Sequence, residues 1–224
     1  MSVSIFKATG LFLLLIAFSA AGQTKSVSKK DTLVNWRPTG IRIGTDLAAA
    51  IKTGVTSGFS NQELFADIGF HRYYLVTEMG RYSRELEIDN GNYSNNGGYL
   101  RIGADVNFLV KDPDKNLFFL GFRYGRARYD ERVQYLTATD YGEQLKIAEN
   151  NNVSSGWLEL TTGLRVKVWK LLWVGYTGRI KFAPSTPSNS PIAPYDIPGY
   201  GLTFKKPWWG FSYYVMMRIP FGKN

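Results

Sequence analysis

The feature that most constrains this sequence is a repeated alternation of apolar and polar residues with a period of two. It occurs in eight short segments, each with a charged residue on its polar side. In residues 99–109, for example, Leu100 and Ile102 alternate with Arg101 and Asp105. A period of two indicates a β-strand whose two faces meet different surroundings. The chain is therefore predicted to be all-β, with one face of its sheet apolar and the other charged.

The spacing of the predicted strands suggests how they are connected. Long links, at 52–62, 83–98, 129–156 and 183–208, alternate with short links at 71–72, 110–116 and 170–171. Short periplasmic turns and long outer loops are typical of bacterial outer-membrane barrels. We therefore expect an eight-stranded antiparallel up-and-down transmembrane β-barrel. Its predicted strands are residues 40–51, 63–70, 73–82, 99–109, 117–128, 157–169, 172–182 and 209–221.

The first residues resemble an export signal. Lys7 precedes the apolar run 11–18, and the small residues Ala20 and Gly22 suit a cleavage site. The run is too short for a membrane-spanning helix, which needs about 20 apolar residues. We expect three parts: a cleaved signal peptide at 1–22, a periplasmic tail at 23–38 and the barrel at 39–224. The expected location is the outer membrane, with the barrel crossing it several times.

Composition narrows the classes of partner. The chain has no cysteine, which excludes a lipoprotein anchor, disulfides and thiolate metal sites. Its net charge of +9 is compatible with nucleic-acid binding. With an export signal present, however, outer-membrane lipid and lipopolysaccharide phosphates are the expected partners, and nucleic acid is not. Aromatic residues make up 15% of the chain, as in barrels with aromatic girdles.

The charged faces of the strands predict the content of the barrel interior. An eight-stranded ring is only wide enough for side chains to fill, and unpaired charges there would cost several kcal/mol each. We expect an ion-paired plug; the alternative is a narrow, anion-preferring channel for small solutes, because bases outnumber acids. The predicted network comprises Arg42, Asp46, Asp67, Glu78, Arg101, Asp105, Arg123, Glu159, Arg165, Lys167, Arg179, Lys181 and Arg218.

A soluble barrel also has strands of period two, so a secreted lipocalin-like carrier remains an alternative. Its apolar face would point inward and its charged face outward. Residue size favours the membrane barrel. Glycines such as Gly103, Gly121 and Gly163 alternate with long charged residues, which suits a crowded interior, whereas the large apolar residues suit a lipid-facing surface.

Catalysis has little support. The only histidine, His71, falls in a predicted periplasmic turn, away from the outer rim where a lipid substrate would lie. Asp112 and Asp114 flank Pro113, and turn chemistry explains them without a cation. We expect no enzyme activity, no catalytic residue, no cofactor and no metal.

Three arginines, Arg81, Arg126 and Arg128, fall at positions of the alternation that face out of the predicted barrel, and they lie at its outer rim. Charges are tolerated there because the rim lies near the membrane interface. Contact with lipopolysaccharide phosphates is one interpretation; solvated rim charges are the other.

Several stretches together resemble a family of small outer-membrane β-barrel proteins of uncharacterised function from Bacteroidota-type bacteria. They are Gly40-Ile-Arg-Ile-Gly-Thr-Asp46, Gly121-Phe-Arg-Tyr-Gly125, Trp157-Leu-Glu-Leu160, Gly163-Leu-Arg-Val-Lys167, Ile197-Pro-Gly199 and residues 214–221. That family is similar in plan to the OmpX and OmpA barrels. The resemblance implies an outer-membrane location and supplies no catalytic residue. The ending Arg218-Ile-Pro-Phe221 resembles the signal read by barrel-assembly machinery, but Pro220 and the residues after Phe221 depart from it.

We therefore expect a structural or surface-interaction role, with residues 83–98, 129–156 and 183–208 as outer loops that form the binding surface. The protein partner, extracellular or periplasmic, is not identified by the sequence.

Overall fold

The computed structural model describes residues 36–140, 142–186, 191–204 and 208–221. The predicted signal peptide, and the predicted tail up to residue 35, lie outside the described residues. The chain divides into residues 1–35 and a unit that begins at Trp36 and contains all the secondary structure given below.

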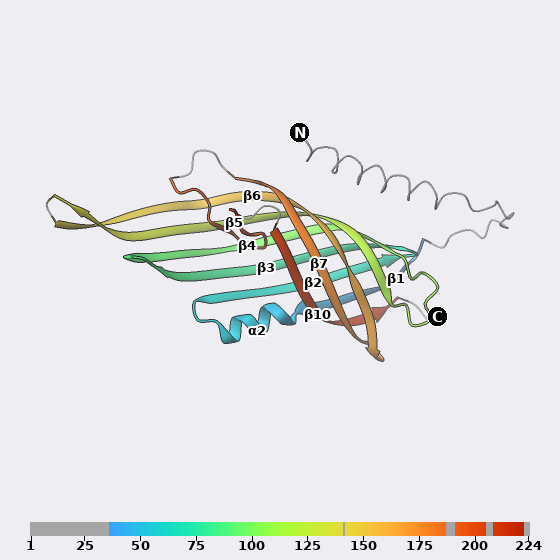
Figure 1. Cartoon of the computed structure of the whole chain (residues 1–224). Coiled ribbons are helices and arrows are strands. Elements are labelled where there is room, and N and C mark those ends of the chain that lie inside the picture. Colours follow the sequence, from blue (N-terminus) through green and yellow to red (C-terminus); the bar gives the residue numbers. More distant parts are fainter. Residues whose placement is uncertain (1–35, 141, 187–190, 205–207, 222–224) are drawn as a thin grey trace, which may run out of the picture. The chain divides into compact units, whose positions relative to one another are not determined.

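Eight strands form one antiparallel sheet that closes on itself, because β1 pairs with both β2 and β10 (Figure 1). The all-β class and the eight antiparallel strands predicted from the sequence are thus confirmed. Around the closed ring the order is β1-β10-β7-β6-β5-β4-β3-β2. The bounds are β1 (Pro38–Asp46), β2 (Phe59–Phe70), β3 (Tyr73–Ile88), β4 (Gly91–Asn107), β5 (Leu117–Thr139), β6 (Gly142–Trp169), β7 (Leu172–Ser185) and β10 (Trp208–Pro220).

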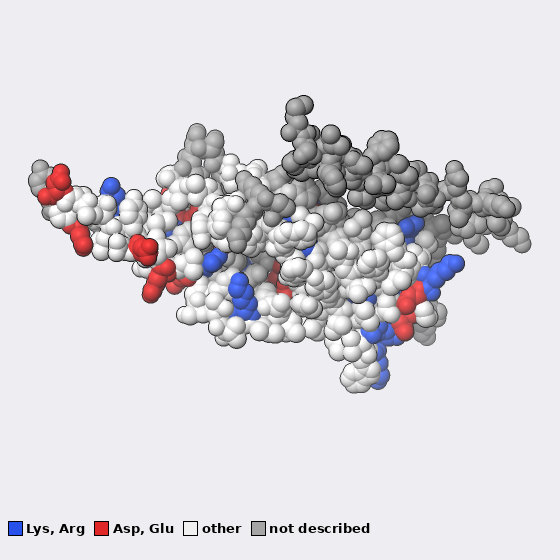
Figure 2. Space-filling model, viewed as in Figure 1, with Lys and Arg blue, Asp and Glu red and all other residues white. Residues whose placement is uncertain are grey.

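The alternation in sequence becomes a separation between the inside and the outside of the ring. Ile102 and Phe122 are 56% and 49% exposed, whereas their neighbours Arg101 and Arg123 are 3% and 0% exposed. Side chains alternate across a strand, so along the ring wall apolar outer residues alternate with buried inner ones. Figure 2 shows the consequence: charged side chains on this face gather toward the ends, and the stretch between them is nearly uncharged.

The predicted outer loops 83–98 and 129–156 are not loops in the structure. The hairpin of β3 and β4 continues to the turn at Asp89 and Asn90, and the hairpin of β5 and β6 continues to Thr139 and Gly142. We call residues 83–97 and 129–155 the outer extension; its long β5–β6 hairpin projects to the left in Figure 1. The prediction failed because both faces of these segments are largely polar, which removes the contrast that marks a strand. Asn90, in this turn, has a φ of 59°, a left-handed conformation that asparagine tolerates.

The first predicted strand is also too long. Residues 47–51 belong to a helix, α2 (Leu47–Val55), which follows β1 directly. Asp46 caps this helix, since its carboxylate accepts hydrogen bonds from the backbone N–H groups of Ala48 and Ala49. Three successive alanines then favour the helix over a strand. Within the described residues, no helix has the length and apolar character needed to cross a membrane.

The link between β7 and β10 contains a small hairpin of its own, β8 (Asp196–Ile197) with β9 (Gly201–Leu202). We call residues 191–204 the strap. Ile197 and Tyr200 are fully buried and pack with Tyr129 and Trp157 of β5 and β6. The strap therefore lies against the inner face of the ring at its outer end.

Candidate functional site

Inside the ring, five of the buried carboxylates lie beside five buried guanidinium groups. All ten are joined by ion pairs into what we call the interior network. Opposite charges at such distances compensate much of the cost of removing each group from water. The members are Glu63, Asp67, Glu78, Asp105 and Glu159 with Arg42, Arg101, Arg123, Arg165 and Arg179.

One half of the network is centred on two aspartates. Asp105 forms ion pairs with Arg123 and with Arg165, both at 2.7 Å. Arg165 also reaches Asp67 at 2.9 Å, and Asp67 in turn pairs with Arg42 at 2.9 Å. Each aspartate is thus shared by two arginines, which ties β1, β2, β4, β5 and β6 together inside the ring.

The other half is centred on glutamates. Glu78 pairs with Arg179 at 2.9 Å and with Arg101 at 3.1 Å. Glu159 pairs with Arg179 at 3.2 Å, and Glu63 pairs with Arg101. These contacts connect β2, β3, β4, β6 and β7, so every strand of the ring except β10 contributes a charge to one half or the other.

Aromatic side chains fill the interior next to the first half. The Arg42 guanidinium lies over the rings of Tyr74 and Trp173, at 4.8 and 5.0 Å from their centroids. The Arg165 guanidinium lies 4.3 Å from the centroid of Phe119. Cation–π contacts of this kind add to the ion pairs. Together the rings and the guanidinium groups occupy this end of the interior.

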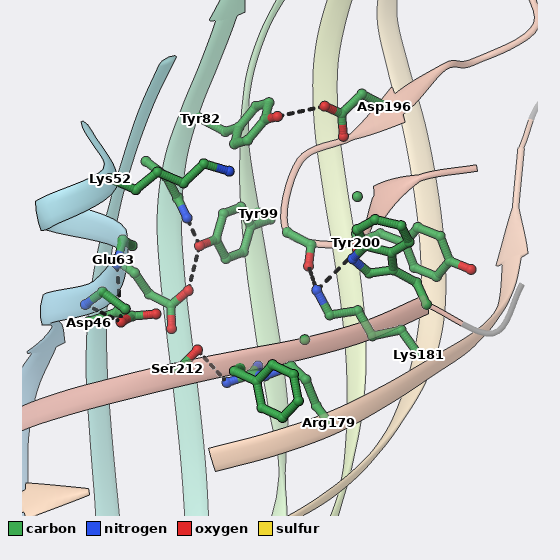
Figure 3. Close-up of a pocket in the computed structure, with 18 of the residues that line it drawn as sticks. Asp46, Lys52, Glu63, Tyr82, Tyr99, Arg179, Lys181, Asp196, Tyr200 and Ser212 are labelled. Atoms are coloured by element: carbon green, nitrogen blue, oxygen red, sulfur yellow. Dashed lines mark hydrogen bonds between the residues drawn. The ribbon is translucent and has the colours of Figure 1, made fainter. Parts of the chain in front are cut away.

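A cavity of about 390 Å³ lies at the other end, above the glutamates. Figure 3 shows its walls: Asp46 and Lys52 on the side of α2, Glu63 and Tyr99 from β2 and β4, Lys181 from β7 and the strap above. A volume of this size is within the range of small-molecule sites. A second, more open hollow of about 640 Å³ also touches Glu63 and Tyr99, from the side of Leu64 and Met79.

Four residues predicted for the network are placed elsewhere. Asp46 caps α2 and also accepts from the Tyr213 backbone N–H, so no described ion pair uses it. Lys181 is buried, but its amine donates to the carbonyls of Gly199 and Tyr200. The Arg218 guanidinium donates to the Thr39 carbonyl at 3.1 Å.

Lys167 is the clearest correction. Its side chain is exposed and pairs with Asp114, in the turn before β5, at 3.2 Å. The pairing of β6 with β5 ends at Arg165, and its pairing with β7 shifts register between Lys167 and Trp169. The parity that predicts an inward side chain therefore no longer applies at this residue.

Sequence reasoning missed Glu63, although it is central to the second half. The residue stands first in a predicted strand, where Glu63, Phe65 and Asp67 share the inward parity, and this pattern could have identified it. Its carboxylate also accepts hydrogen bonds from the hydroxyls of Tyr99 and Tyr214. Those tyrosines were not expected to bind charges, because an aromatic residue gives no sign of its hydrogen-bond partner in sequence.

The strap is held to the outer extension by buried polar contacts. The Asp196 carboxylate accepts from the Tyr82 hydroxyl at 2.6 Å and from Arg84 at 2.7 Å. Its backbone carbonyl accepts from Asn95 at 2.6 Å.

A second set of contacts fixes the beginning of the strap. Glu131 accepts from the Tyr93 hydroxyl at 2.6 Å and from the Tyr195 backbone N–H at 2.9 Å. Asn150 and Ile192 exchange two hydrogen bonds between side chain and backbone. The strap is therefore docked on β3, β4, β5 and β6, and it covers the outer end of the interior.

The three rim arginines, Arg81, Arg126 and Arg128, are exposed on the outer face of the ring. Arg81 and Arg128 are the register neighbours of Gly98 on its two sides. Arg126 donates to the Ser154 hydroxyl at 3.1 Å. Their outward direction agrees with the parity, and what they contact beyond the chain stays a prediction.

Nothing in the described part of the chain resembles a metal centre, since no three His, Asp or Glu side chains are grouped to hold an ion. His71 lies in the tight turn between β2 and β3 with a φ of 55°. The arrangement is thus suited to holding the ring together through fixed charges and to binding a small polar group in the cavity.

These features define a class: an all-β protein whose eight antiparallel strands close around a charged, ion-paired interior. A family model described as a domain of unknown function, DUF6048, matches residues 3–224. The chain belongs to the DUF6048 family. No curated protein and no solved structure matches it.

Proposed function

We propose that the protein is a transmembrane β-barrel of the bacterial outer membrane with a non-catalytic, surface-interaction role. The resemblance in sequence to outer-membrane barrels similar in plan to OmpX and OmpA supports this, as does the signal-like start of the chain. Barrel-assembly machinery is the partner expected during insertion, and lipid with lipopolysaccharide is the partner expected afterwards.

The distribution of apolar side chains supports the membrane location. Leu120, Phe122, Leu160 and Leu164 are each between 43% and 49% exposed on the outside of the ring. A soluble protein rarely exposes a continuous apolar surface of this kind. A lipocalin-like carrier would have these residues inside, around its ligand, where this chain has Arg123 and Glu159.

The ion-paired interior favours a plug over a channel. Arg101, Arg123 and Arg179 cross the interior to reach carboxylates on other strands. Opening a path for solutes would separate buried ion pairs, and breaking one costs about 3–5 kcal/mol. The scaffold is therefore rigid, and function is expected at its outer end.

The observation that carries the interaction role is the edge of β6 in the outer extension. β6 pairs with β7 only from Gly156 onward, while on its other edge it pairs with β5 as far as Gly142. In residues 143–149, no strand in the described part of the chain pairs with that second edge. Leu145 and Ile147 on this stretch are 60% and 49% exposed.

An unpaired edge of this kind binds an extended segment of another protein by adding it as a strand. Lys146 lies between Leu145 and Ile147, and Glu149 is already paired with Arg132 at 3.0 Å, so the exposed apolar pair, and not a net charge, sets the preference of this edge. We therefore propose an extended, apolar segment of another protein as the partner class of this edge.

Two measurements test the proposal. Carbonate extraction of cell envelopes should leave the protein in the membrane fraction, and recovery in the soluble fraction would contradict the location. Leu145→Lys with Ile147→Lys should abolish crosslinking of partners at the outer extension. Ile88→Lys, at the end of the neighbouring hairpin, is the matched control and should leave crosslinking intact. Equal crosslinking by both variants would remove the edge from the proposal.

A further inference from the structure

We propose that the cavity above the interior network binds the anionic head of an amphipathic molecule, a phosphate or carboxylate attached to an acyl chain. The head would lie at Lys181, and the chain would leave sideways through a gap in the ring wall beside α2. The access route from the bilayer rests on the proposed membrane location; the binding site itself does not.

The first argument is charge. Within the interior network five carboxylates face five guanidinium groups, so its formal charges cancel. Lys181, next to the network and only 7% exposed, is a sixth cation. Its cross-strand neighbour Glu159 gives one oxygen to the Trp157 indole N–H, at 2.7 Å, and the other to Arg179. The amine of Lys181 is left without a carboxylate of its own.

The second argument is direction. The Lys181 amine donates to the carbonyls of Gly199 and Tyr200, at 2.6 and 3.0 Å, and both residues line the cavity (Figure 3). An ammonium has three N–H donors, and these two bonds leave the third for a ligand. Backbone carbonyls compensate a buried cation only partly, so an anion in the cavity would be bound favourably.

The remaining charges of the cavity wall are already engaged or lie at its mouth. Asp196 is held by Tyr82 and Arg84. One oxygen of Asp46 accepts from three backbone N–H groups, two of them at the start of α2, which stabilises its negative charge. Lys52 is exposed, and its amine lies 4.1 Å from the centroid of the Phe59 ring. A second cation therefore stands where a ligand would enter.

The third argument is the gap in the wall. β1 ends at Asp46, where it pairs with Tyr214 of β10, and its last partner on β2 is Leu64. Beyond these points β2 continues to Phe59 and β10 to Trp208 with no strand of the described chain between them. The ring is thus open over several residues on one side.

Helix α2 occupies this gap but does not seal it as a strand would. Thr53 of α2 bonds the backbone N–H and carbonyl of Asn61 on β2. On the β10 side, Asp46 bonds the Tyr213 N–H, and no described bond of this kind reaches Phe211 or Trp209. The edge of β10 is consequently the freer side of the gap.

The surface around the gap is apolar. Leu47 and Ile51, one turn apart on α2, are 45% and 57% exposed, and Trp209 and Phe211 on β10 are 60% and 62% exposed. These side chains offer an acyl chain a continuous path away from the cavity. Together, a surplus buried amine, an exposed lysine at the mouth and an apolar exit match a molecule with one charged end.

The test uses the full chain in a neutral sugar detergent and three probes: dodecyl phosphate, inorganic phosphate and a neutral dodecyl glycoside. Binding is followed by tryptophan fluorescence, since Trp208 lines the cavity. We expect dodecyl phosphate to bind more than about 100-fold more tightly than inorganic phosphate, because burial of each methylene is favourable. Equal affinities for these two probes, or tight binding of the neutral glycoside, would overturn the proposal.

Variants locate the head group. Lys181→Met should weaken dodecyl phosphate about tenfold or more, because it removes a charge-assisted hydrogen bond. Lys167→Met removes an exposed lysine near the end of β6, at the end of the ring away from the cavity. It should leave the affinity for dodecyl phosphate unchanged. Lys52→Glu is exposed and will not prevent folding; it should also weaken binding. Unchanged affinity in both Lys181→Met and Lys52→Glu would contradict the site.

The two proposals can fail separately. Carbonate extraction reports whether the chain lies in a membrane, whereas the titration in detergent reports whether the cavity binds an amphipathic anion. A soluble chain that still binds dodecyl phosphate in a Lys181-dependent manner would overturn the membrane location and retain the site.

Discussion

The Arg165 guanidinium on β6 donates a hydrogen bond to the Asp105 carboxylate on β4 at 2.7 Å, across the intervening strand β5. The residue of β5 beside Asp105 is Gly121. A Cβ atom there would lie 1.9 Å from the Asp105 carboxylate and 2.9 Å from the Ala104 carbonyl. The ion pair therefore depends on the missing side chain of Gly121.

Gly121→Ala should destabilise the ring by about 1–3 kcal/mol, the usual cost of overpacking. The measurement is the midpoint of urea unfolding in detergent. Gly178→Ala is the matched control, because its Cβ would face outward with its nearest neighbour at 3.6 Å. Equal midpoints for the two variants would show that the interior accommodates the methyl group.

Glu78→Gln should destabilise the ring more than Gly121→Ala does. Glu78 pairs with Arg101 and Arg179, and its loss leaves both guanidinium groups with an uncompensated share of charge. Breaking a buried pair costs about 3–5 kcal/mol, which unfolding by urea would detect. Glu149→Gln breaks the Arg132–Glu149 pair, whose side chains are 47% and 40% exposed, and should cost less than about 1 kcal/mol. A smaller effect for Glu78→Gln than for Glu149→Gln would contradict the role of the network.

Asp46→Ala should destabilise α2 by about 1 kcal/mol, the typical cost of losing an N-cap. Faster hydrogen exchange at the backbone amides of Ala48 and Ala49 would report it. Asp46→Asn keeps a capping oxygen and should restore most of the protection. Unchanged exchange in Asp46→Ala would mean that packing, not the cap, holds the helix.

Asp196→Ala should release the strap. The change removes the bonds from Tyr82 and Arg84 and leaves two partly buried donors without their acceptor. We expect limited proteolysis within residues 191–204 to accelerate about tenfold or more. Asp89→Ala, in the exposed turn of the β3–β4 hairpin, should leave the cleavage rate unchanged, and a similar rate in both variants would argue against this docking.

High pH should weaken the outer extension. Burial raises the pKa of Tyr129 from its ordinary 10.0 to about 12, and burial together with Glu131 raises the pKa of Tyr93. A raised pKa in the folded state means that the stabilisation is complete below pH 10 and is lost as the pH rises toward the folded value. Tyrosinate absorbance should therefore show tyrosines that titrate late and together with loss of structure. Tyr129→Phe should remove one late-titrating group; if every tyrosine of the wild type ionises near pH 10, the expectation is wrong.

The sequence alone determined the alternation and therefore the two faces of the ring. Ile102 and Arg101 are on opposite sides of β4 because neighbouring side chains on a strand must point in opposite directions. The alternation also predicted two short turns, because it is interrupted there. One is at His71 and Arg72, between β2 and β3, and the other is near Lys170 and Leu171, between β6 and β7.

Only the tertiary structure decided at which residues the alternation no longer predicts the position of a side chain. Asp46 has the parity of an interior charge, but it caps α2, because β1 stops at the point where α2 enters the wall. Lys167 has the same parity and is exposed, because it lies beyond Arg165, the last residue of β6 that pairs with β5. The outer extension was missed because its two faces are alike, so no alternation marks its strands.

The sequence also did not determine which of the buried charged residues pair with each other. Parity places Glu63, Glu78 and Arg179 inside, but it cannot say that Arg179 will reach Glu78 on β3 from β7. That choice depends on the curvature and register of the closed ring, which bring together residues a hundred positions apart in the chain. The side of a strand to which a side chain points is fixed locally by the backbone. Which residues meet across the interior depends on how the whole sheet closes.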